Sequence, residues 1–223
     1  NRVISITASD GLFEAGLTII DLSADIYAAA NNVIDVSNDV TGDNAWELIG
    51  SAGIDTITAS TGNDTITGGA GADNIILASG TNSITDLGVG GDFDIVTVAS
   101  DATVVATAAG AWSATSATDN AGVDAAAFTI NVGSAGAVDL TSAGVSSAGY
   151  AVVSTGISAV TGSASSDTLT NTLGAASMTG LAGIDTFIAT AGALTITDLG
   201  VGGDFDIVTV ASGATVVATV AGA

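Results

Sequence analysis

Apolar and polar residues alternate in short runs along much of this chain. Side chains of successive strand residues point to opposite faces, so this alternation predicts short β-strands that each bury one face. Gly, Asp, Asn and Ser residues flank the runs and provide turns between them. Residues 24–31 fit a short helix instead. The pattern therefore predicts an all-β fold, with strands expected at 17–23, 32–37, 55–58, 64–67, 93–99 and 214–220.

A nine-residue spacing organises the segment between Gly53 and Asp73. In each round a glycine precedes an aspartate by two positions, and the aspartate precedes an isoleucine by two positions. Glycine lets the backbone turn through positive φ, and the apolar residue points inward from the strand that follows. The rounds contain Gly53, Asp55 and Ile57; Gly62, Asp64 and Ile66; Gly71, Asp73 and Ile75; and, in a weaker fourth round, Gly80, Asn82 and Ile84.

The same spacing predicts how the rounds stack. If nine residues form half a coil, each position lies over the residue eighteen positions later, about 4.8 Å away in a parallel ladder. Asp55 then lies over Asp73 on one edge, and Asp64 lies over Asn82 on the opposite edge. Stacked carboxylates repel each other unless a cation lies between successive turns. The spacing therefore predicts cation sites along the edges of the coil.

The best round reads GGAGADNII at 68–76, which has the pattern G-G-x-G-x-D-x-U-x. In this segment the chain resembles the RTX, or hemolysin-type, calcium-binding repeat family, of the kind found in bacterial surface-layer and other large surface proteins. The resemblance implies a parallel β-roll, or β-solenoid, with calcium in its glycine-rich turns. It also implies secretion of an unfolded acidic chain through a one-step (type I) exporter, with folding outside the cell.

The residue types favour calcium over other metals. The chain has no His and no Cys, so it lacks the nitrogen and sulfur ligands of zinc, copper or iron–sulfur sites. Its acids comprise 21 Asp and only 2 Glu, and Asp is the carboxylate that fits tight turns. A flexible set of carboxylates and carbonyls suits calcium better than magnesium. The alternative is that these aspartates only form turns, but turn formation does not require their regular spacing.

A larger repeat, offset by 112 residues, divides the chain. The sequence ITDLGVGGDFDIVTVAS occurs at 84–100 and again at 196–212. The second copy ends where the first continues, which predicts that the parent polypeptide runs on through further units. We expect β-rich lead-in strands at 1–49, an RTX-like β-roll unit at 50–111, a β-rich connecting segment at 112–161 and a second RTX-like unit at 162–223.

The two copies differ in their candidate ligands. Asp55 and Asp73 correspond to Asp167 and Asp185, whereas Asp64 and Asn82 correspond to Ala176 and Leu194. The second copy is therefore predicted to hold calcium on one edge and apolar packing on the other. Both copies carry a glycine-rich loop with three aspartates, which is interpreted either as a further calcium site or as a solvated loop. The candidate calcium ligands are Asp55, Asp64, Asp73, Asn82, Asp86, Asp92, Asp94, Asp167, Asp185, Asp198, Asp204 and Asp206.

Charge excludes several functions. The net charge is −22, and Arg2 is the only basic residue, so binding to nucleic-acid phosphates or to anionic membranes is excluded. Apolar stretches are interrupted by Gly, Ser and Thr, so membrane insertion is not expected. Without His, Cys or Lys the common nucleophilic active sites are absent, and we expect the protein not to be an enzyme.

Two structural roles fit these observations. In the first, the chain is a calcium-stabilised extracellular repeat segment that assembles with copies of itself into a bacterial surface layer, sheath or filament. In the second, it is a spacer of a giant adhesin, or the secretion-associated region of a toxin or secreted hydrolase. The 112-residue unit favours the first role, because simple secretion regions consist of bare nonapeptides.

Overall fold

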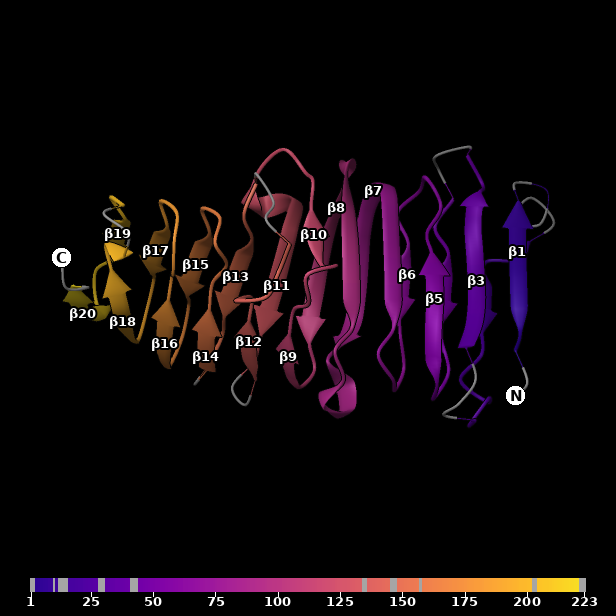
Figure 1. Cartoon of the computed structure of the whole chain (residues 1–223), viewed down its shortest axis with the longest axis horizontal. Helices are drawn as coiled ribbons and strands as arrows, with labels where there is room; N and C mark the ends of the chain where they lie inside the picture. The colour runs from indigo at the N-terminus through magenta and orange to yellow at the C-terminus, as the bar shows by residue number, and fades with distance from the viewer. Residues whose placement is uncertain are drawn as a thin grey trace.

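Short strands stacked side by side form an elongated β-solenoid (Figure 1). The computed structural model of the chain describes residues 3–9, 11, 16–27, 31–40, 44–133, 136–144, 148–156, 158–201 and 204–220. Every pairing between the described strands is parallel. The predicted all-β parallel β-roll is therefore confirmed.

The strands of the N-terminal half follow the alternation of apolar and polar residues. In Ile54–Thr58, for example, Ile57 is buried while its neighbours Thr56 and Thr58 are only partly buried. The elements of this half are β1 (Ser5–Ser9), β2 (Ile19–Asp21), β3 (Asn31–Asn38), β4 (Glu47–Ile49), β5 (Ile54–Thr58), β6 (Thr65–Thr67), β7 (Asn74–Leu87), the 3-10 helix η1 (Val89–Gly91) and β8 (Ile95–Ala108).

The C-terminal half continues the same stack. Its elements are β9 (Ala111–Ser113), β10 (Asp119–Asn120), the 3-10 helix η2 (Ala125–Ala127), β11 (Phe128–Val132), β12 (Ala137–Asp139), β13 (Ala151–Ser154), β14 (Ser158–Thr161), β15 (Thr168–Asn171), β16 (Ala175–Thr179), β17 (Thr186–Ala189), β18 (Ala193–Leu199), β19 (Ile207–Val210) and β20 (Thr215–Val220). The described strands form one sheet of 14 strands and one of 6 strands.

Strand register confirms the predicted coil length in the nonapeptide segment. Thr56 of β5 pairs with Asn74 of β7, eighteen residues later. The next coil is longer, because it contains the turn with η1, and Asn74 pairs with Ile95 of β8. The second copy repeats this longer step, with Thr186 of β17 paired to Ile207 of β19.

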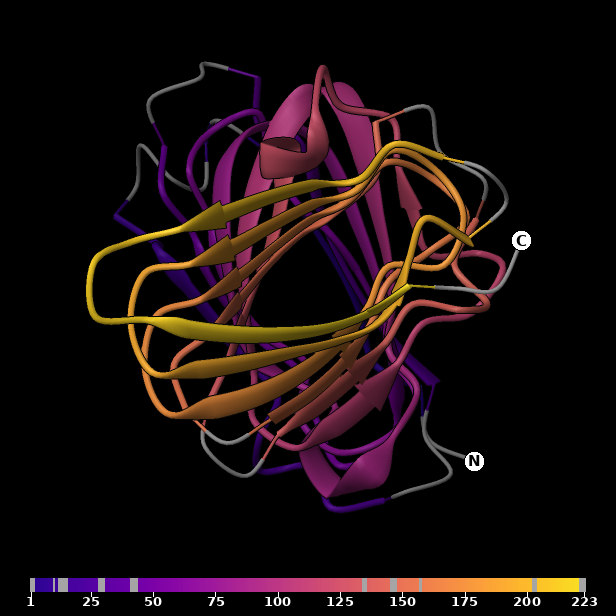
Figure 2. The same ribbon diagram turned by 90° about the vertical axis from the view of Figure 1, so that its left-hand side faces the viewer.

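Apolar side chains from the two faces of each coil fill the interior. Figure 2 looks along the stack and shows the strands surrounding this interior. The isoleucines that follow the aspartates in the first copy occupy it, and the equivalent residues of the second copy continue the column. These buried residues are Ile57, Ile66, Ile75 and Ile84, followed by Leu169, Met178, Phe187 and Ile196.

The two copies are joined by an unbroken strand ladder. The first half of β8 pairs with β10 and its second half pairs with β11. β11 in turn pairs with β13, from which the ladder continues through β15 and β17 to β19. Aromatic rings fill the core at this junction: Phe128 lies 6.4 Å from Trp112 and 5.6 Å from Tyr150 between ring centroids.

The helix expected at 24–31 is not found in the described part of that segment. Residue 24 ends a turn and residues 25–27 have no regular secondary structure, residues 28–30 lie outside the described residues, and Asn31 begins β3. Asp25 accounts for the difference, because its carboxylate accepts a hydrogen bond from the N–H of Tyr27 and so closes a local turn. Among the described residues, no helix has the length and apolar character needed to cross a membrane.

Candidate metal centre

Aspartates stack along one edge of the solenoid, as the spacing predicts. The backbone N–H of Asp55 donates to Oδ1 of Asp73 at 2.8 Å, and the N–H of Asp73 donates to Oδ1 of Asp94 at 3.1 Å. The second copy has the same ladder, in which Asp167 donates to Asp185 at 2.8 Å and Asp185 donates to Asp206 at 3.0 Å. Each carboxylate is thus held against the turn that precedes it.

The opposite edge is shorter and differs between the copies. The N–H of Asp64 donates to Oδ1 of Asn82 at 3.1 Å, and Asp64 itself accepts from the N–H of Trp46 at 2.9 Å. In the second copy the equivalent positions are Ala176 and Leu194, which are paired in the ladder and belong to the hydrophobic core. The carboxylate stack of this edge is therefore confined to the first copy.

The glycine-rich loop at 86–94 binds the preceding turn through all three of its carboxylates. Asp86 accepts from the N–H groups of Gly68 at 2.9 Å and Gly69 at 2.8 Å. Asp92 accepts from Gly71 at 2.7 Å. Asp94 accepts both from Asp73 and from Gly88 of its own loop, at 2.8 Å for the latter. These charge-assisted bonds fix the loop on the end of the nonapeptide stack.

The loop of the second copy repeats this arrangement. Asp198 accepts from Gly180 at 2.9 Å and from Leu181 at 2.7 Å. Asp204 accepts from Gly183 at 2.9 Å, and Asp206 accepts from Gly200 at 2.7 Å. The recurrence of the same donors and acceptors 112 residues later shows that the loop sequence specifies this geometry.

Two buried carboxylate oxygens in this network lack a partner. Oδ2 of Asp73 and Oδ2 of Asp185 are buried and accept no hydrogen bond, although both residues are fully enclosed, with 0% of their surface exposed. A Cβ built on Gly68 would lie only 2.5 Å from Oδ2 of Asp73, and one on Gly180 would lie closer still to Oδ2 of Asp185. Glycine therefore lets each unpartnered oxygen approach the backbone closely, as Gly50 and Gly162 do for Oδ2 of Asp55 and Asp167.

The electrostatics of these two positions disfavour a bare carboxylate. Burial, and secondarily the neighbouring carboxylates, raise the pKa of Asp73 and that of Asp185 from 3.8 to about 8. Burial likewise raises the pKa of Asp94 and of Asp167 to about 6. Arg2, the only basic residue in the sequence, lies outside the described residues, so no described cation compensates these charges.

The donor set fits calcium. A buried carboxylate oxygen without a partner, with further carboxylates nearby, suits a hard cation. Within the described ranges, no three acidic side chains converge in a way that could hold a metal ion. Asp73 and Asp185 would therefore hold calcium together with main-chain carbonyl oxygens, and the bound ion would neutralise the stacked negative charge.

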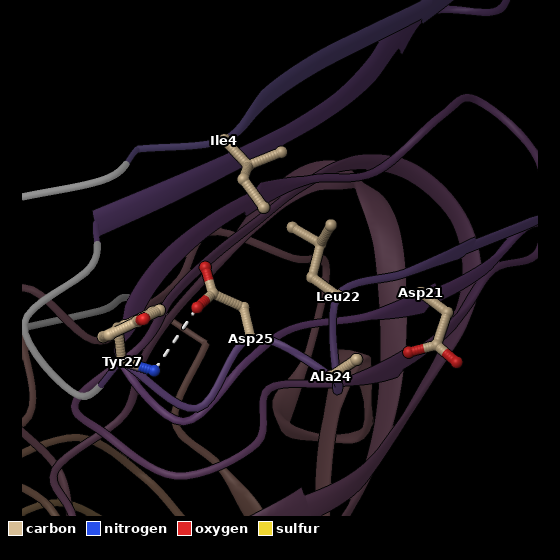
Figure 3. A pocket seen from close by; sticks show the side chains of 6 residues that line it. All are labelled: Ile4, Asp21, Leu22, Ala24, Asp25 and Tyr27. Atoms are coloured by element: carbon tan, nitrogen blue, oxygen red, sulfur yellow. Dashed lines mark hydrogen bonds between the residues drawn. The ribbon is translucent and has the colours of Figure 1, made fainter.

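A separate pocket lies in the N-terminal coil (Figure 3). Its volume is about 300 Å³, and Asp21 and Asp25 contribute carboxylates beside Leu22 and Tyr27. Both carboxylates are used as local turn acceptors: Asp21 binds the N–H of Ser23 at 2.8 Å, and Asp25 binds the N–H of Tyr27 at 3.3 Å. Asn32 connects this pocket to the aspartate stack, because its Nδ2 donates to Oδ2 of Asp25 at 3.4 Å and its N–H donates to Oδ1 of Asp55 at 3.2 Å.

Sequence reasoning missed the serines that reach some of the stacked aspartates. Ser51 donates to Asp55 from both its N–H and its hydroxyl, at 2.5 Å and 2.9 Å. Ser60 and Ser163 occupy equivalent positions beside Asp64 and Asp167. The signal was present in the sequence, because these serines stand at the second position of the nonapeptide, where the consensus has glycine.

Comparison with known families agrees with this geometry. Residues 49–84 match the family model of the RTX calcium-binding nonapeptide repeat, in four copies. No curated protein and no solved structure matched the chain. The matched segment contains β5, β6 and the first part of β7, together with Asp55, Asp64 and Asp73. The chain is therefore a β-roll with RTX calcium-binding repeats in residues 49–84.

Proposed function

We propose that this chain is a calcium-stabilised extracellular structural segment that assembles with copies of itself into a bacterial surface layer, sheath or filament. Calcium ions and further copies of the chain are its partners, and it has no catalytic role. Secretion before folding suits a chain with a net charge of −22, because self-repulsion opposes compaction until divalent ions bind.

The continuous ladder between the two copies is the observation that carries the assembly proposal. Copy two is joined to copy one by parallel strand pairing from β8 through β11 to β13, with an apolar core common to both. A solenoid of this kind adds units by stacking one more coil on an exposed strand edge. The internal junction therefore provides a template for contacts between molecules.

The outermost described strands of the stack are paired on one side only. β1 pairs with β3, and β20 pairs with β18; no described strand lies on the other side of either. Equivalent valines of the two copies are also buried to different extents. Val96 and Val104 of β8 are buried to within 1%, whereas the equivalent Val208 and Val216 are only partly buried. A further coil on this edge, whether from the same polypeptide or from another copy of the chain, would bury them as the core buries their counterparts.

Electron microscopy of the purified chain, with calcium and with a chelator, tests this role. We expect ordered lattices or fibres in calcium and their loss on chelation. Val216→Lys should abolish assembly, because it places a charge where the next coil would pack. Val217→Lys on the same strand is the matched control, since Val217 is 67% exposed. Isolated rods in calcium would contradict self-assembly and favour the spacer role instead.

A further inference from the structure

The stacked aspartates fall into two classes according to the donors that reach them. In the first class, the serine at the second position of the nonapeptide supplies two donors and the preceding coil supplies a third. Asp55 accepts from the N–H of Ser51 at 2.5 Å, from its hydroxyl at 2.9 Å and from the N–H of Asn32 at 3.2 Å. The pattern repeats at Asp64, which accepts from Ser60 and from the N–H of Trp46. It repeats again at Asp167, which accepts from Ser163 and from the N–H of Tyr150.

The serine hydroxyl also binds the turn itself. The Oγ of Ser51 accepts from the N–H of Gly53 at 3.2 Å, and that of Ser60 accepts from the N–H of Gly62 at 3.0 Å. In the second copy, Ser163 accepts from the N–H of Ser165 at 3.1 Å. Each serine hydroxyl thus bridges a backbone N–H of its turn and the carboxylate of the same round.

In the second class, the second position of the nonapeptide is not serine, and its backbone N–H points to the next coil instead of to the aspartate of its own round. Gly69 has φ of +98° and directs its N–H to Asp86 of the next coil instead of to Asp73. Asp73 therefore accepts one hydrogen bond, from Asp55, and its Oδ2 has no partner. The same holds for Asp185, whose Oδ2 is also buried without a partner.

The second copy keeps this orientation although it lacks the glycine. Leu181 occupies the position of Gly69, has φ of +75°, and donates its N–H to Asp198. It is the only non-glycine residue with positive φ among the residues that the structure describes. An L-residue in this conformation costs about 1 kcal/mol or more. The surrounding turn therefore imposes the orientation that leaves Asp185 unpartnered.

We infer that the serine takes the place of a cation, so that the rounds of Asp55, Asp64 and Asp167 close without metal, and calcium binds only at Asp73 and Asp185. This inference rests on the proposed calcium-binding function and assigns two ions to the described chain. A carboxylate with three donors has little to gain from a cation, whose binding would break charge-assisted bonds already formed. A buried carboxylate oxygen with no donor is stabilised by a cation, because the cation replaces the hydration that burial removed.

Calcium titration of the 223-residue chain by calorimetry tests the assignment. We expect two ions per chain, one in Asp73→Asn, one in Asp185→Asn and none in the double variant. The matched controls are Asp55→Asn and Asp167→Asn, which occupy the same edge and should still bind two. A loss of one ion in either control, or binding of more than two ions by the unaltered chain, would overturn the inference.

A second pair of variants covers the case in which the asparagine controls fail to fold. Ser51→Ala and Ser163→Ala should bind two ions and should lower the melting temperature equally in calcium and in chelator. A calcium count that falls with either serine would overturn the assignment. Absence of any calcium binding by the unaltered, folded chain is a different result: it would overturn the proposed calcium-binding function itself, and with it the sites at Asp73 and Asp185.

Discussion

The presence of a serine at the second position of the nonapeptide distinguishes Asp55, Asp64 and Asp167 from Asp73 and Asp185. Where serine stands there, as at Ser51, the carboxylate of Asp55 has three donors. Where glycine stands there, as at Gly69, Asp73 keeps a buried oxygen without a partner. A buried carboxylate oxygen without a donor costs more free energy than one that accepts hydrogen bonds, because its lost hydration is not replaced.

The raised pKa values predict how the stability of the metal-free fold depends on pH. Burial in the fold raises the pKa of Asp73 and that of Asp185 from 3.8 to about 8. The folded state therefore binds more protons between these values, and its stability falls as pH rises from about 4 to about 8. In chelator we expect a melting temperature several degrees higher at pH 5 than at pH 8.

The control is the melting temperature of the double variant Asp73→Asn, Asp185→Asn, measured in chelator at the same two pH values. Asparagine cannot ionise, so the double variant should lose most of this pH dependence. In calcium the trend of the unaltered chain should weaken, because the ion neutralises the carboxylates that protons otherwise neutralise. Equal slopes for the variant and the unaltered chain would contradict the role given to these two residues.

The close approach of the backbone to the unpartnered oxygen predicts the effect of a single methyl group. Gly68→Ala would place Cβ about where Oδ2 of Asp73 needs room, 2.5 Å away. Overpacking of this kind costs about 1–3 kcal/mol, and we expect calcium affinity at this site to fall by about tenfold or more. Gly133→Ala is the control, because nothing lies within 4 Å of its Cβ position. Unchanged affinity in Gly68→Ala would argue against calcium beside Asp73.

At the scale of elements, sequence predicted the strands and their period but not every step of the stack. Alternation and the nine-residue spacing placed Ile57 and Ile75 in one column, and the register of eighteen followed from them. The longer step from Asn74 to Ile95 was not predicted, because it depends on how the loop at 86–94 binds the preceding turn. That contact joins residues of different coils and leaves no periodic signal.

The candidate site was predicted only in part for the same reason. Spacing identified Asp55 and Asp73 as neighbours, and a hydrogen bond from the N–H of Asp55 joins them. It did not place Asp94 beside Asp73, where the structure has it. It could not distinguish Asp55 from Asp73, because the difference arises from peptide orientation in the turn. Serine at 51 carried the information, but its meaning depends on a hydrogen bond that only the folded turn contains.

The junction between the copies predicts a strong local contribution to stability. Phe128 is fully buried between Trp112 and Tyr150. Phe128→Ala should lower the free energy of unfolding by about 3–5 kcal/mol, as large-to-small changes in well-packed cores do. Val123→Ala, at a side chain that is 86% exposed, should change it by less than about 0.5 kcal/mol. Denaturant unfolding of both variants measures the difference, and a similar loss in the two would contradict the packing described.

At the scale of the whole molecule, one continuous core joins the turns proposed to bind calcium to strands that contain no candidate ligand. The chain has a net charge of −22, yet its two buried carboxylate oxygens without a partner lie at equivalent positions of the two copies, Asp73 and Asp185. Calcium would thus stabilise the turns at Asp73 and Asp185, whereas apolar packing stabilises the aromatic junction between them. Chelation should loosen the molecule in two regions and leave the strands between them.

Hydrogen exchange followed by mass spectrometry tests this uneven response. On chelation we expect protection to fall first in the turns at 68–73 and 180–185, where amide groups bind the loop carboxylates. β11 and β13 at the junction should remain protected, because their ladder and core contain no candidate metal ligand. Uniform loss of protection along the chain would indicate that the fold depends on calcium as a single cooperative unit.

A crystal structure of the chain with bound calcium tests the central claim most directly, through anomalous scattering from the ions. The account predicts one peak beside Oδ2 of Asp73 and one beside Oδ2 of Asp185, the two buried oxygens without partners. It predicts none beside Asp55 or Asp167, whose carboxylates the serines satisfy. Empty sites at Asp73 and Asp185 in calcium-saturated crystals would contradict the account.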